Sequence, residues 1–264
     1  MHFVVCIKQV PDTSDIKIDP KTNTLIREGV TSIINPYDTY AIEEAVRLCE
    51  KMGGKVTALT MGSPQAESAL REAISMGVND AILISDPIFA GSDTWATSYT
   101  LSMALRKIAD YSLILCGKQA IDGDTAQVGP GIAAHLDLPQ ITFVRRIENI
   151  TPELIIAERL LDEGIEVLEG SLPCVLTVVK DINKPRLPSL KSILSARKAV
   201  ITHWHAADLA CDASRLGLDG SPTKVKKIFI PPARGNGELL TGEPDEMVQT
   251  LVKKIKDEII AARL

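Results

Sequence analysis

Residues 113–130 read LILCGKQAIDGDTAQVGP, an apolar run followed by a loop and then by the start of a helix. Gly117 and Gly123 permit a sharp turn and a close approach of the backbone to a ligand. The amides that open the helix have no acceptor within it, so an anion can take them. The segment predicts either a phosphate-binding loop or, as at any strand–loop–helix junction, a plain strand end and a capped helix.

Three earlier stretches repeat this pattern, with strands expected at residues 3–7, 56–61 and 81–84 and a helix after each. Asp38 is the candidate N-cap of the first helix and Gly53 its C-cap. Four alternations of strand and helix predict an α/β fold, a doubly wound, mostly parallel sheet with helices on both faces. The loops after residues 7, 61, 84 and 116 then share the edge where such sheets bind ligands, and residues 35–38 (NPYD) are expected to join it.

The pattern changes after residue 139. Three extended segments, at residues 141–150, 154–161 and 165–168, predict an antiparallel excursion, and the apolar residues 174–179 are expected to rejoin the main sheet. A polar segment at 17–29 is turn-rich and suits a hairpin. A short basic helix is expected at 190–198, followed by irregular chain to about residue 242.

A last helix is expected from Pro244, with one apolar stripe, made of Met247, Val248, Leu251, Val252, Ile255 and Ile259. We expect an α/β domain over residues 1–230 and a C-terminal helical arm over residues 231–264. The arm packs either on a neighbouring subunit or back on its own domain.

Composition excludes several classes of protein. A net charge of -5 and an aromatic content of 4% argue against a nucleic-acid partner. The first residues resemble no leader sequence and no apolar run approaches the roughly 20 residues of a membrane span, which predicts a cytoplasmic protein. The five cysteines are scattered without a Cys-x-x-Cys pair, and His203 and His205 have no compact ligand set beside them, so we expect no metal site.

The chemistry of the loop indicates a binder of a cofactor. The chain has no P-loop, no Gly-x-Gly-x-x-Gly and no Gly-x-Ser-x-Gly motif. A carboxylate aimed at a diphosphate would repel it, so of Asp122 and Asp124 we expect one to cap the helix and the other to hold loop amides or a ribose hydroxyl. The loop amides and the Thr125 hydroxyl then face phosphate, and Gln119 and Gln127 donate to phosphate or base.

Over essentially its whole length the sequence resembles the beta subunits of electron-transferring flavoproteins. Residues 5–11 (VCIKQVP) are similar to the family's first strand and loop, residues 35–38 to its second nucleotide contact and residues 119–130 to its nucleotide-binding loop. Residues 158–177 resemble its diagnostic segment, and residues 185–198 the loop that docks on dehydrogenases.

The resemblance implies a fold of the adenine-nucleotide alpha hydrolase-like type and a heterodimer with a larger alpha subunit, which carries FAD on a mobile domain. In simple electron carriers the beta-subunit pocket holds AMP, and in bifurcating members it holds a second FAD. Gly123 between two aspartates, Asp38 after NPY, and residues 91–98 (GSDTWATS) resemble the bifurcating subtype. NADH would then reduce the FAD, with electrons passing to the alpha-subunit FAD and a flavin-dependent acyl-CoA or hydroxy-acid dehydrogenase, and to ferredoxin or flavodoxin.

The same resemblance assigns binding residues and no catalytic residue. Partner docking is implied for Leu190, Lys191 and Ile193. The implied cofactor-binding residues are Cys6, Asn35, Pro36, Tyr37, Asp38, Met61, Gly91, Asp93, Thr94, Thr97, Gly117, Gln119, Ala120, Ile121, Asp122, Gly123, Asp124, Thr125, Ala126, Gln127, Val128, Gly129 and Pro130.

Three rival interpretations stay open. The first is a simple electron carrier with AMP in the pocket. The second is an ATP-dependent ligase or stress-type nucleotide-binding domain, although residues 8–11 (KQVP) stand where its glycine-serine phosphate loop would lie. The third is a non-catalytic scaffold.

Overall fold

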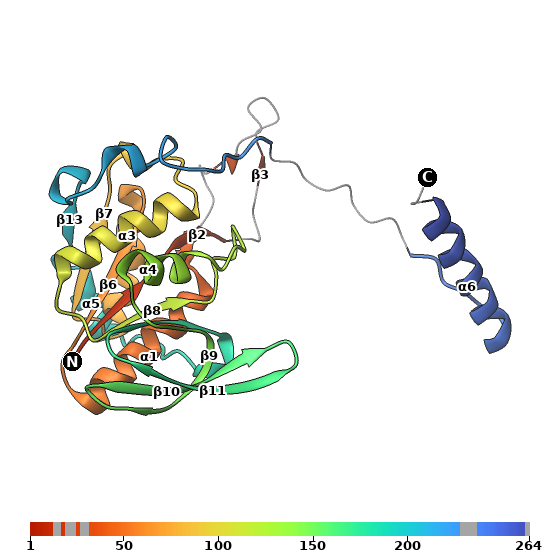
Figure 1. Ribbon diagram of the computed structural model, residues 1–264, viewed down its shortest axis with the longest axis horizontal. Helices are drawn as coiled ribbons and strands as arrows, with labels where there is room; N and C mark the ends of the chain where they lie inside the picture. The colour runs from red at the N-terminus through yellow and green to blue at the C-terminus, as the bar shows by residue number, and fades with distance from the viewer. Residues whose placement is uncertain (13–16, 19–24, 27–31, 228–236, 262–264) are drawn as a thin grey trace. The chain divides into compact units, whose positions relative to one another are not determined.

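The chain forms two units, Met1–Lys227 and Ile228–Leu264. The computed structural model describes residues 1–12, 17–18, 25–26, 32–227 and 237–261 (Figure 1). The boundary predicted at 230/231 lies outside the described residues, so the two predicted domains stay a prediction.

A nine-stranded sheet forms the centre of the first unit, in the order β11-β10-β9-β12-β8-β1-β6-β7-β13. The predicted parallel strands are β1 (His2–Cys6), β6 (Lys55–Met61), β7 (Asp80–Ile84), β8 (Leu113–Gly117) and β12 (Cys174–Val178). The predicted antiparallel excursion is β9 (Gln140–Ile150), β10 (Leu154–Leu161) and β11 (Gly164–Ser171). The mostly parallel α/β sheet, its antiparallel excursion and the return of β12 are confirmed.

One strand of the sheet was not predicted. Residues 199–242 were expected to be irregular, yet β13 (Thr202–Trp204) pairs in parallel with β7 and forms the edge of the sheet. In the segment 17–29, β3 (Lys17–Ile18) and β4 (Leu25–Ile26) pair antiparallel, as a hairpin requires, and the rest of that segment lies outside the described residues. A further small pair joins β2 (Gln9–Pro11) and β5 (Ser32–Ile34).

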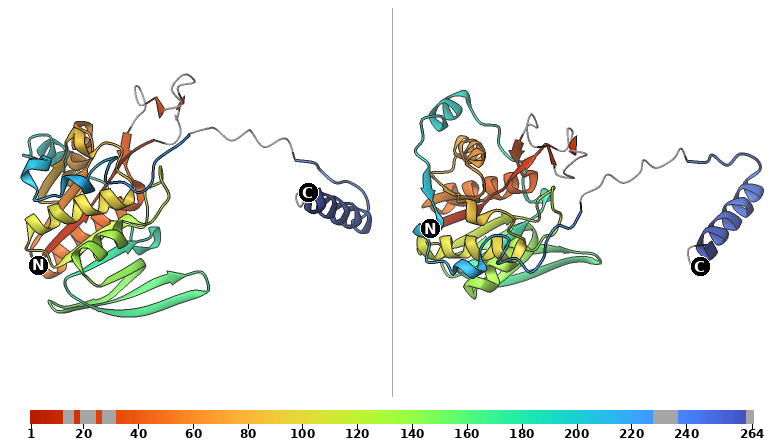
Figure 2. Two further views of the ribbon diagram at one scale, coloured as in Figure 1. Left: turned by 45° about the horizontal axis from the view of Figure 1, so that its top comes forward. Right: turned by 90° about the horizontal axis from the view of Figure 1, so that it is seen from above.

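Helices cover both faces of the sheet, as Figure 2 shows from above. Two lie on one face, α1 (Pro36–Met52) and α2 (Glu67–Ser75), and two on the other, α3 (Thr94–Ile108) and α4 (Val128–Leu136). Because successive strand residues point to opposite faces, Phe3 and Val5 pack in the core beneath α1 and α2. Val4 and Cys6 belong to the core beneath α3 and α4. Short 3-10 turns are η2 (Pro64–Ala66), η3 (Pro87–Phe89), η4 (Lys180–Ile182), η5 (Ala206–Asp208) and η6 (Ala213–Arg215).

The ends of the helices agree with one predicted cap of α1 and disagree with the other. The N-cap of α1 is Asn35, not Asp38, because Pro36 already occupies the first helical position. Gly53 is the predicted C-cap, with a φ of 76° that favours glycine. At the start of α3, the Asp93 side chain accepts from the amides of Trp95 and Ala96, as a good N-cap does.

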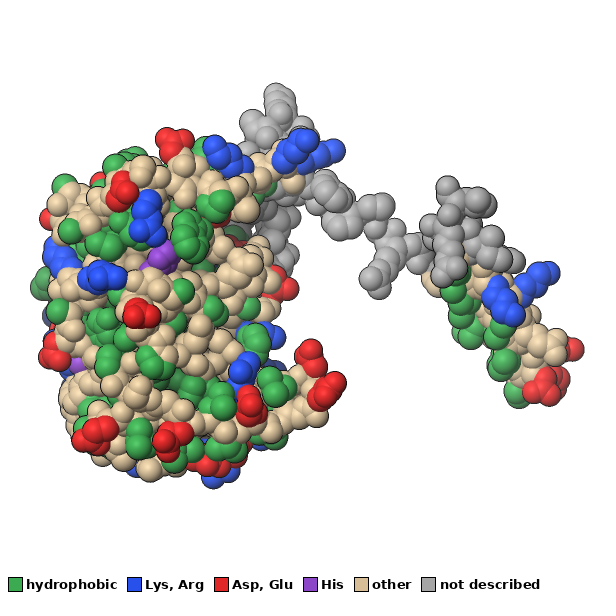
Figure 3. Space-filling view, in the orientation of Figure 1, with side chains coloured by type: hydrophobic (Ala, Val, Ile, Leu, Met, Phe, Trp, Pro, Cys, Tyr) green, Lys and Arg blue, Asp and Glu red, His purple; other side chains and the backbone are tan. Residues whose placement is uncertain are grey.

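The second unit contains α6 (Pro244–Ala261), which confirms the last predicted helix. Figure 3 shows its apolar side chains along one side, where Val248, Leu251, Val252, Ile255 and Ile259 are all exposed. Among the described residues, no helix combines the length and the hydropathy that crossing a membrane requires.

Candidate nucleotide site

The sheet reverses its direction of growth between β1 and β8. The chain runs from β1 to β6 and β7 on one side, and later returns to place β8 and β12 on the other side of β1. The loops after β1 and β8 therefore diverge, and in open α/β sheets ligands bind in the crevice that this opens. Residues 118–127, the loop predicted to bind phosphate, lie at this switch point.

Asp38 joins the two diverging loops. Its Oδ2 accepts the backbone N–H of Lys8 at 2.7 Å, and its Oδ1 accepts the backbone N–H of Gly117 at 3.2 Å. Burial raises the pKa of this carboxyl group to about 7, against the opposing effect of hydrogen bonds from Asn35, Lys8 and Gly117. Asp38 therefore holds the ends of β1 and β8 at a fixed separation instead of capping α1.

Gly117 allows this close approach. A Cβ atom built on it would lie 2.3 Å from the Asp38 carboxylate and 2.7 Å from the backbone of Tyr37. Its role is therefore contact with the first turn of α1, not the sharp turn predicted for it. Gly123 has no positive φ either, and the left-handed positions of the loop are Asp124 and Ala126, each with a φ of 54°.

Asn35 fixes the middle of the loop. Its Nδ2 donates to the carbonyl oxygen of Gln119 at 2.8 Å, and its Oδ1 accepts the N–H of Ile121 at 3.1 Å. The side chain is almost fully buried, with 1% exposed, so both bonds are shielded from water. The prediction that residues 35–38 join the rim is confirmed.

The two loop aspartates are paired with other side chains. Lys8 Nζ donates to both carboxylate oxygens of Asp122 at 2.7 Å, and Gln119 Nε2 donates to Asp124 Oδ1. The prediction that one of them caps α4 is wrong, because the N-cap is Gln127 and no side chain bonds there. Lys8 balances the charge of Asp122 at the place where an anion would bind.

Backbone donors are free beside these aspartates. Among the described residues, nothing accepts the backbone N–H groups of Thr125, Ala126, Gln127 and Val128. A Cβ atom on neighbouring Gly123 would meet nothing within 4 Å. A row of unpaired amides at a helix start, with open space beside it, fits the phosphate groups of a nucleotide or of FAD.

The start of α3 lies against the start of α4, since Thr94 Oγ1 donates to Gln127 Oε1 at 2.8 Å. Asp93 also binds a distant segment: its Oδ2 accepts from the N–H of Thr223 at 3.0 Å and from Oγ1 at 2.8 Å, and its own N–H donates to Ser221 Oγ at 2.9 Å. Although burial opposes it, hydrogen bonds from Ala96, Thr223 and Trp95 lower the pKa of Asp93.

The other predicted residues fall into two places. Cys6 and Met61 end β1 and β6 at the same edge, and Cys6 is in register with Cys116 of β8. Hydrogen bonding to Cys6 and burial raise the pKa of the Cys116 thiol. The predicted docking residues Leu190, Lys191 and Ile193 lie elsewhere, on α5 (Leu190–Ala196), which packs against α2.

Sequence reasoning missed Lys8, Ser221 and Thr223. No periodicity marks Ser221 and Thr223, and Lys8 is distant in sequence from Asp122.

His203 Nε2 lies 3.3 Å from Glu67 Oε2, and no group of three or more metal-ligating side chains occurs in the part of the chain that the structure describes.

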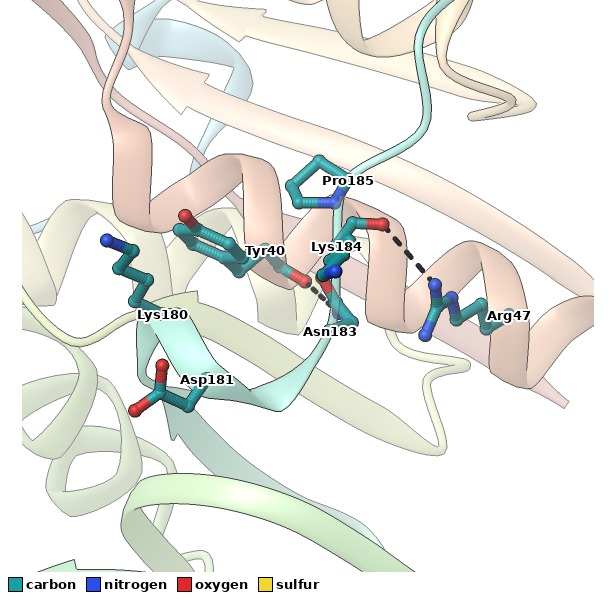
Figure 4. Close-up of a pocket in the computed structure, with 7 residues that line it drawn as sticks. All are labelled: Tyr40, Arg47, Lys180, Asp181, Asn183, Lys184 and Pro185. Atoms are coloured by element: carbon teal, nitrogen blue, oxygen red, sulfur yellow. Dashed lines mark hydrogen bonds between the residues drawn. The ribbon is translucent and has the colours of Figure 1, made fainter.

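A separate pocket lies between α1 and the segment that follows β12 (Figure 4). Its lining residues are Tyr40, Arg47, Lys180, Asp181, Asn183, Lys184 and Pro185. None of them is a predicted cofactor-binding residue. The pocket is therefore separate from the rim at the switch point.

The fold and its switch-point loops define a doubly wound α/β domain of the ligand-binding class. The family model for the electron transfer flavoprotein domain matches residues 22–209. The chain is 52% identical over 256 residues to the electron transfer flavoprotein subunit beta of Thermoanaerobacterium thermosaccharolyticum, covering 97% of this chain and 98% of the relative. The chain belongs to the electron transfer flavoprotein family, in which it is a beta subunit.

Two further relatives carry other names. Subunit CarD of the caffeyl-CoA reductase-Etf complex of Acetobacterium woodii is 47% identical over 262 residues, with 98% of this chain and 100% of the relative covered. Protein FixA of Bradyrhizobium diazoefficiens is 47% identical over 262 residues, with 97% and 91% covered.

Proposed function

We propose that this beta subunit belongs to the bifurcating class and holds an FAD at the switch point between β1 and β8. FAD bound here would accept a hydride from NADH and pass its electrons to two acceptors. The acceptors are the alpha-subunit FAD, which serves a flavin-dependent dehydrogenase, and ferredoxin or flavodoxin. The observation that carries the cofactor site is the row of unpaired loop amides beside open space at Gly123. The choice of FAD over AMP rests on the resemblance of Asp38, Gly123 and residues 91–98 to the bifurcating subtype.

The chain's own residues bind and orient the cofactor. The amides of residues 125–128 bind its phosphate oxygens, and Lys8 keeps Asp122 from repelling them. Asn35 and Asp38 hold the loop in its binding shape before the ligand arrives. Thr94, at the junction of α3 and α4, is small enough to leave room for a flavin ring.

Protein partners follow from the family and from two exposed apolar surfaces. The stripe on α6 packs on the alpha subunit of a heterodimer, because such a stripe costs free energy in water. Leu190 and Ile193 dock on the dehydrogenase. The name of the CarD relative couples an Etf to a CoA-thioester reductase, which favours an acyl-CoA type of dehydrogenase for this chain.

The flavin content of the purified heterodimer tests the proposal. The complex with the alpha subunit is expected to hold two FAD per heterodimer, and both should be bleached by NADH. One FAD with one AMP would contradict the bifurcating assignment and support a simple electron carrier. ATP turnover by the isolated chain would instead support the ligase or stress-type alternative.

A further inference from the structure

Helix α5 is too short and too exposed to keep its shape unaided. It has seven residues, and Ala196 is its one buried residue. Leu190, Ile193 and Leu194 lie on one face at helical spacing and are 74%, 37% and 50% exposed. Isolated helices of this length do not persist in water, so something outside α5 must hold it.

Arg71 of α2 holds the C-terminal end of α5. Its Nη1 donates to the carbonyl oxygens of Ala196, Arg197 and Ala199 at 2.9, 3.0 and 3.2 Å. The last carbonyls of a helix have no partner within the helix and carry partial negative charge. The two Nη1 hydrogens are therefore shared among three carbonyl oxygens at and just beyond the end of the helix, and the guanidinium group places a positive charge where the helix favours it.

Glu67 orients the Arg71 side chain. Arg71 Nε and Nη2 donate to Glu67 Oε1 at 2.9 and 2.6 Å, one turn earlier on α2. The planar guanidinium thus binds a carboxylate along one edge while Nη1 faces α5. A lysine has no such fork and could replace only part of this arrangement.

Arg186 holds the segment that leads into α5. Its backbone N–H and Nε donate to Glu43 Oε2 at 3.0 and 2.9 Å, and Nη1 and Nη2 donate to the Glu50 carboxylate at 2.6 and 3.0 Å. Glu43 is 2% exposed, and a buried carboxylate requires its cation. Arg47 adds a bond from Nη2 to the Lys184 carbonyl at 3.3 Å, drawn in Figure 4.

We propose that Arg71 and Arg186 are positioning residues for docking of the partner dehydrogenase. They fix both ends of residues 186–199, so that the apolar face of α5 is ordered before the partner binds. Binding to an ordered surface avoids the entropy cost of immobilising a flexible segment. The partner that this surface fits is a protein with an apolar pocket for Leu190 and Ile193. The inference rests on the docking role in the proposed function and does not involve the cofactor.

Steady-state kinetics of the complete heterodimer test the positioning role. The acceptor is chosen from purified flavin-dependent acyl-CoA and 2-hydroxy-acid dehydrogenases as the one that the wild type reduces fastest. Arg71→Met is expected to raise the KM for this dehydrogenase about tenfold, close to 1.4 kcal/mol of docking free energy, with kcat unchanged. Arg71→Lys should recover part of the loss. Backbone hydrogen exchange of residues 187–199 should be fastest in Arg71→Met, intermediate in Arg71→Lys and slowest in the wild type.

Arg106→Met is the matched control. Arg106 Nη2 donates to the His135 carbonyl at 2.8 Å near the end of α4, so the variant loses the same type of bond away from α5. It should leave the KM and the exchange of residues 187–199 unchanged. If Arg71→Met does not give a folded complex, Arg71→Lys carries the same comparison.

The outcomes separate this inference from the docking role itself. An unchanged KM in Leu190→Ala would remove the docking role. A raised KM in Leu190→Ala together with wild-type KM and exchange in Arg71→Met would overturn the positioning role alone. A fall in kcat at constant KM would also overturn it, because Arg71 would then act after docking.

Discussion

The buried carboxyl group of Asp38 makes the stability of the chain depend on pH. Its pKa is about 7 in the folded chain, against an ordinary value of 3.8. Between these values the folded chain retains a proton that the unfolded chain has released, so raising the pH favours unfolding. The Asp38 carboxyl group titrates about three pH units higher in the folded chain than in the unfolded chain. The protonated group therefore contributes roughly 4 kcal/mol to the free energy of unfolding at low pH, and this contribution is lost by about pH 7.

Urea unfolding of the nucleotide-free full chain between pH 5 and pH 8 measures this effect. The contribution of Asp38 to the unfolding free energy should fall by about 1.4 kcal/mol per pH unit up to its folded pKa and then level off. Asp38→Asn removes the titrating group, so the change with pH of the stability difference between the wild type and the variant measures the contribution of Asp38. On top of this pH-dependent difference, the variant should carry a constant cost of about 1–3 kcal/mol, because its side-chain NH2 group cannot accept the second of the two backbone N–H groups.

Asp212→Asn is the control for this experiment. Hydrogen bonds from Ser214 lower the pKa of the exposed Asp212, so this group stays ionised across the window in both states. Its substitution should leave the pH dependence of unfolding as in the wild type. Parallel pH profiles for Asp38→Asn and the wild type would refute the account of Asp38.

Three further outcomes are expected. Leu190→Ala should slow electron delivery to the dehydrogenase and leave NADH oxidation by the heterodimer intact; equal delivery rates would remove the docking role. Gly123→Asp should fold normally, within about 0.5 kcal/mol of the wild type, because its site is open. That variant should purify with one FAD fewer per heterodimer, and full flavin content would count against the position of the phosphate groups. Lys8→Met should weaken FAD binding in equilibrium dialysis by roughly 1 kcal/mol, about fivefold, and adding Asp122→Asn should restore it; no recovery in the double variant would disprove charge balancing.

Periodic and continuous patterns in the sequence predicted the fold well. The run at residues 3–7 reads as a buried strand because both faces of β1 are covered, and its alternate side chains do enter two different cores. β13 escaped prediction because three residues at a sheet edge carry no pattern of their own, and their pairing with β7 depends on chain more than 100 residues away.

Local rules failed where a side chain found a distant partner. Asn35 and Asp38 are both good N-cap types, but the Asp38 carboxylate is taken by amides 30 and 79 residues away. Asp122 looked like a cap because Lys8, 114 residues earlier, could not be placed beside it from the sequence. The glycine at 117 was identified correctly as special, although the reason is a close contact with α1 and not a turn.

The loop that follows β8 has a stem fixed by buried side chains and an exposed tip, whose two aspartates pair with Lys8 and Gln119. Residues 117, 119 and 121 are tied by Asp38 and Asn35, whereas residues 122–125 are exposed and form no part of either core. Substitutions at the tip can therefore alter which ligand is retained with little cost to folding. The same fold can in this way come to bind different cofactors during evolution. Exchanging only residues 122–125 is a practical way to change which cofactor the protein binds.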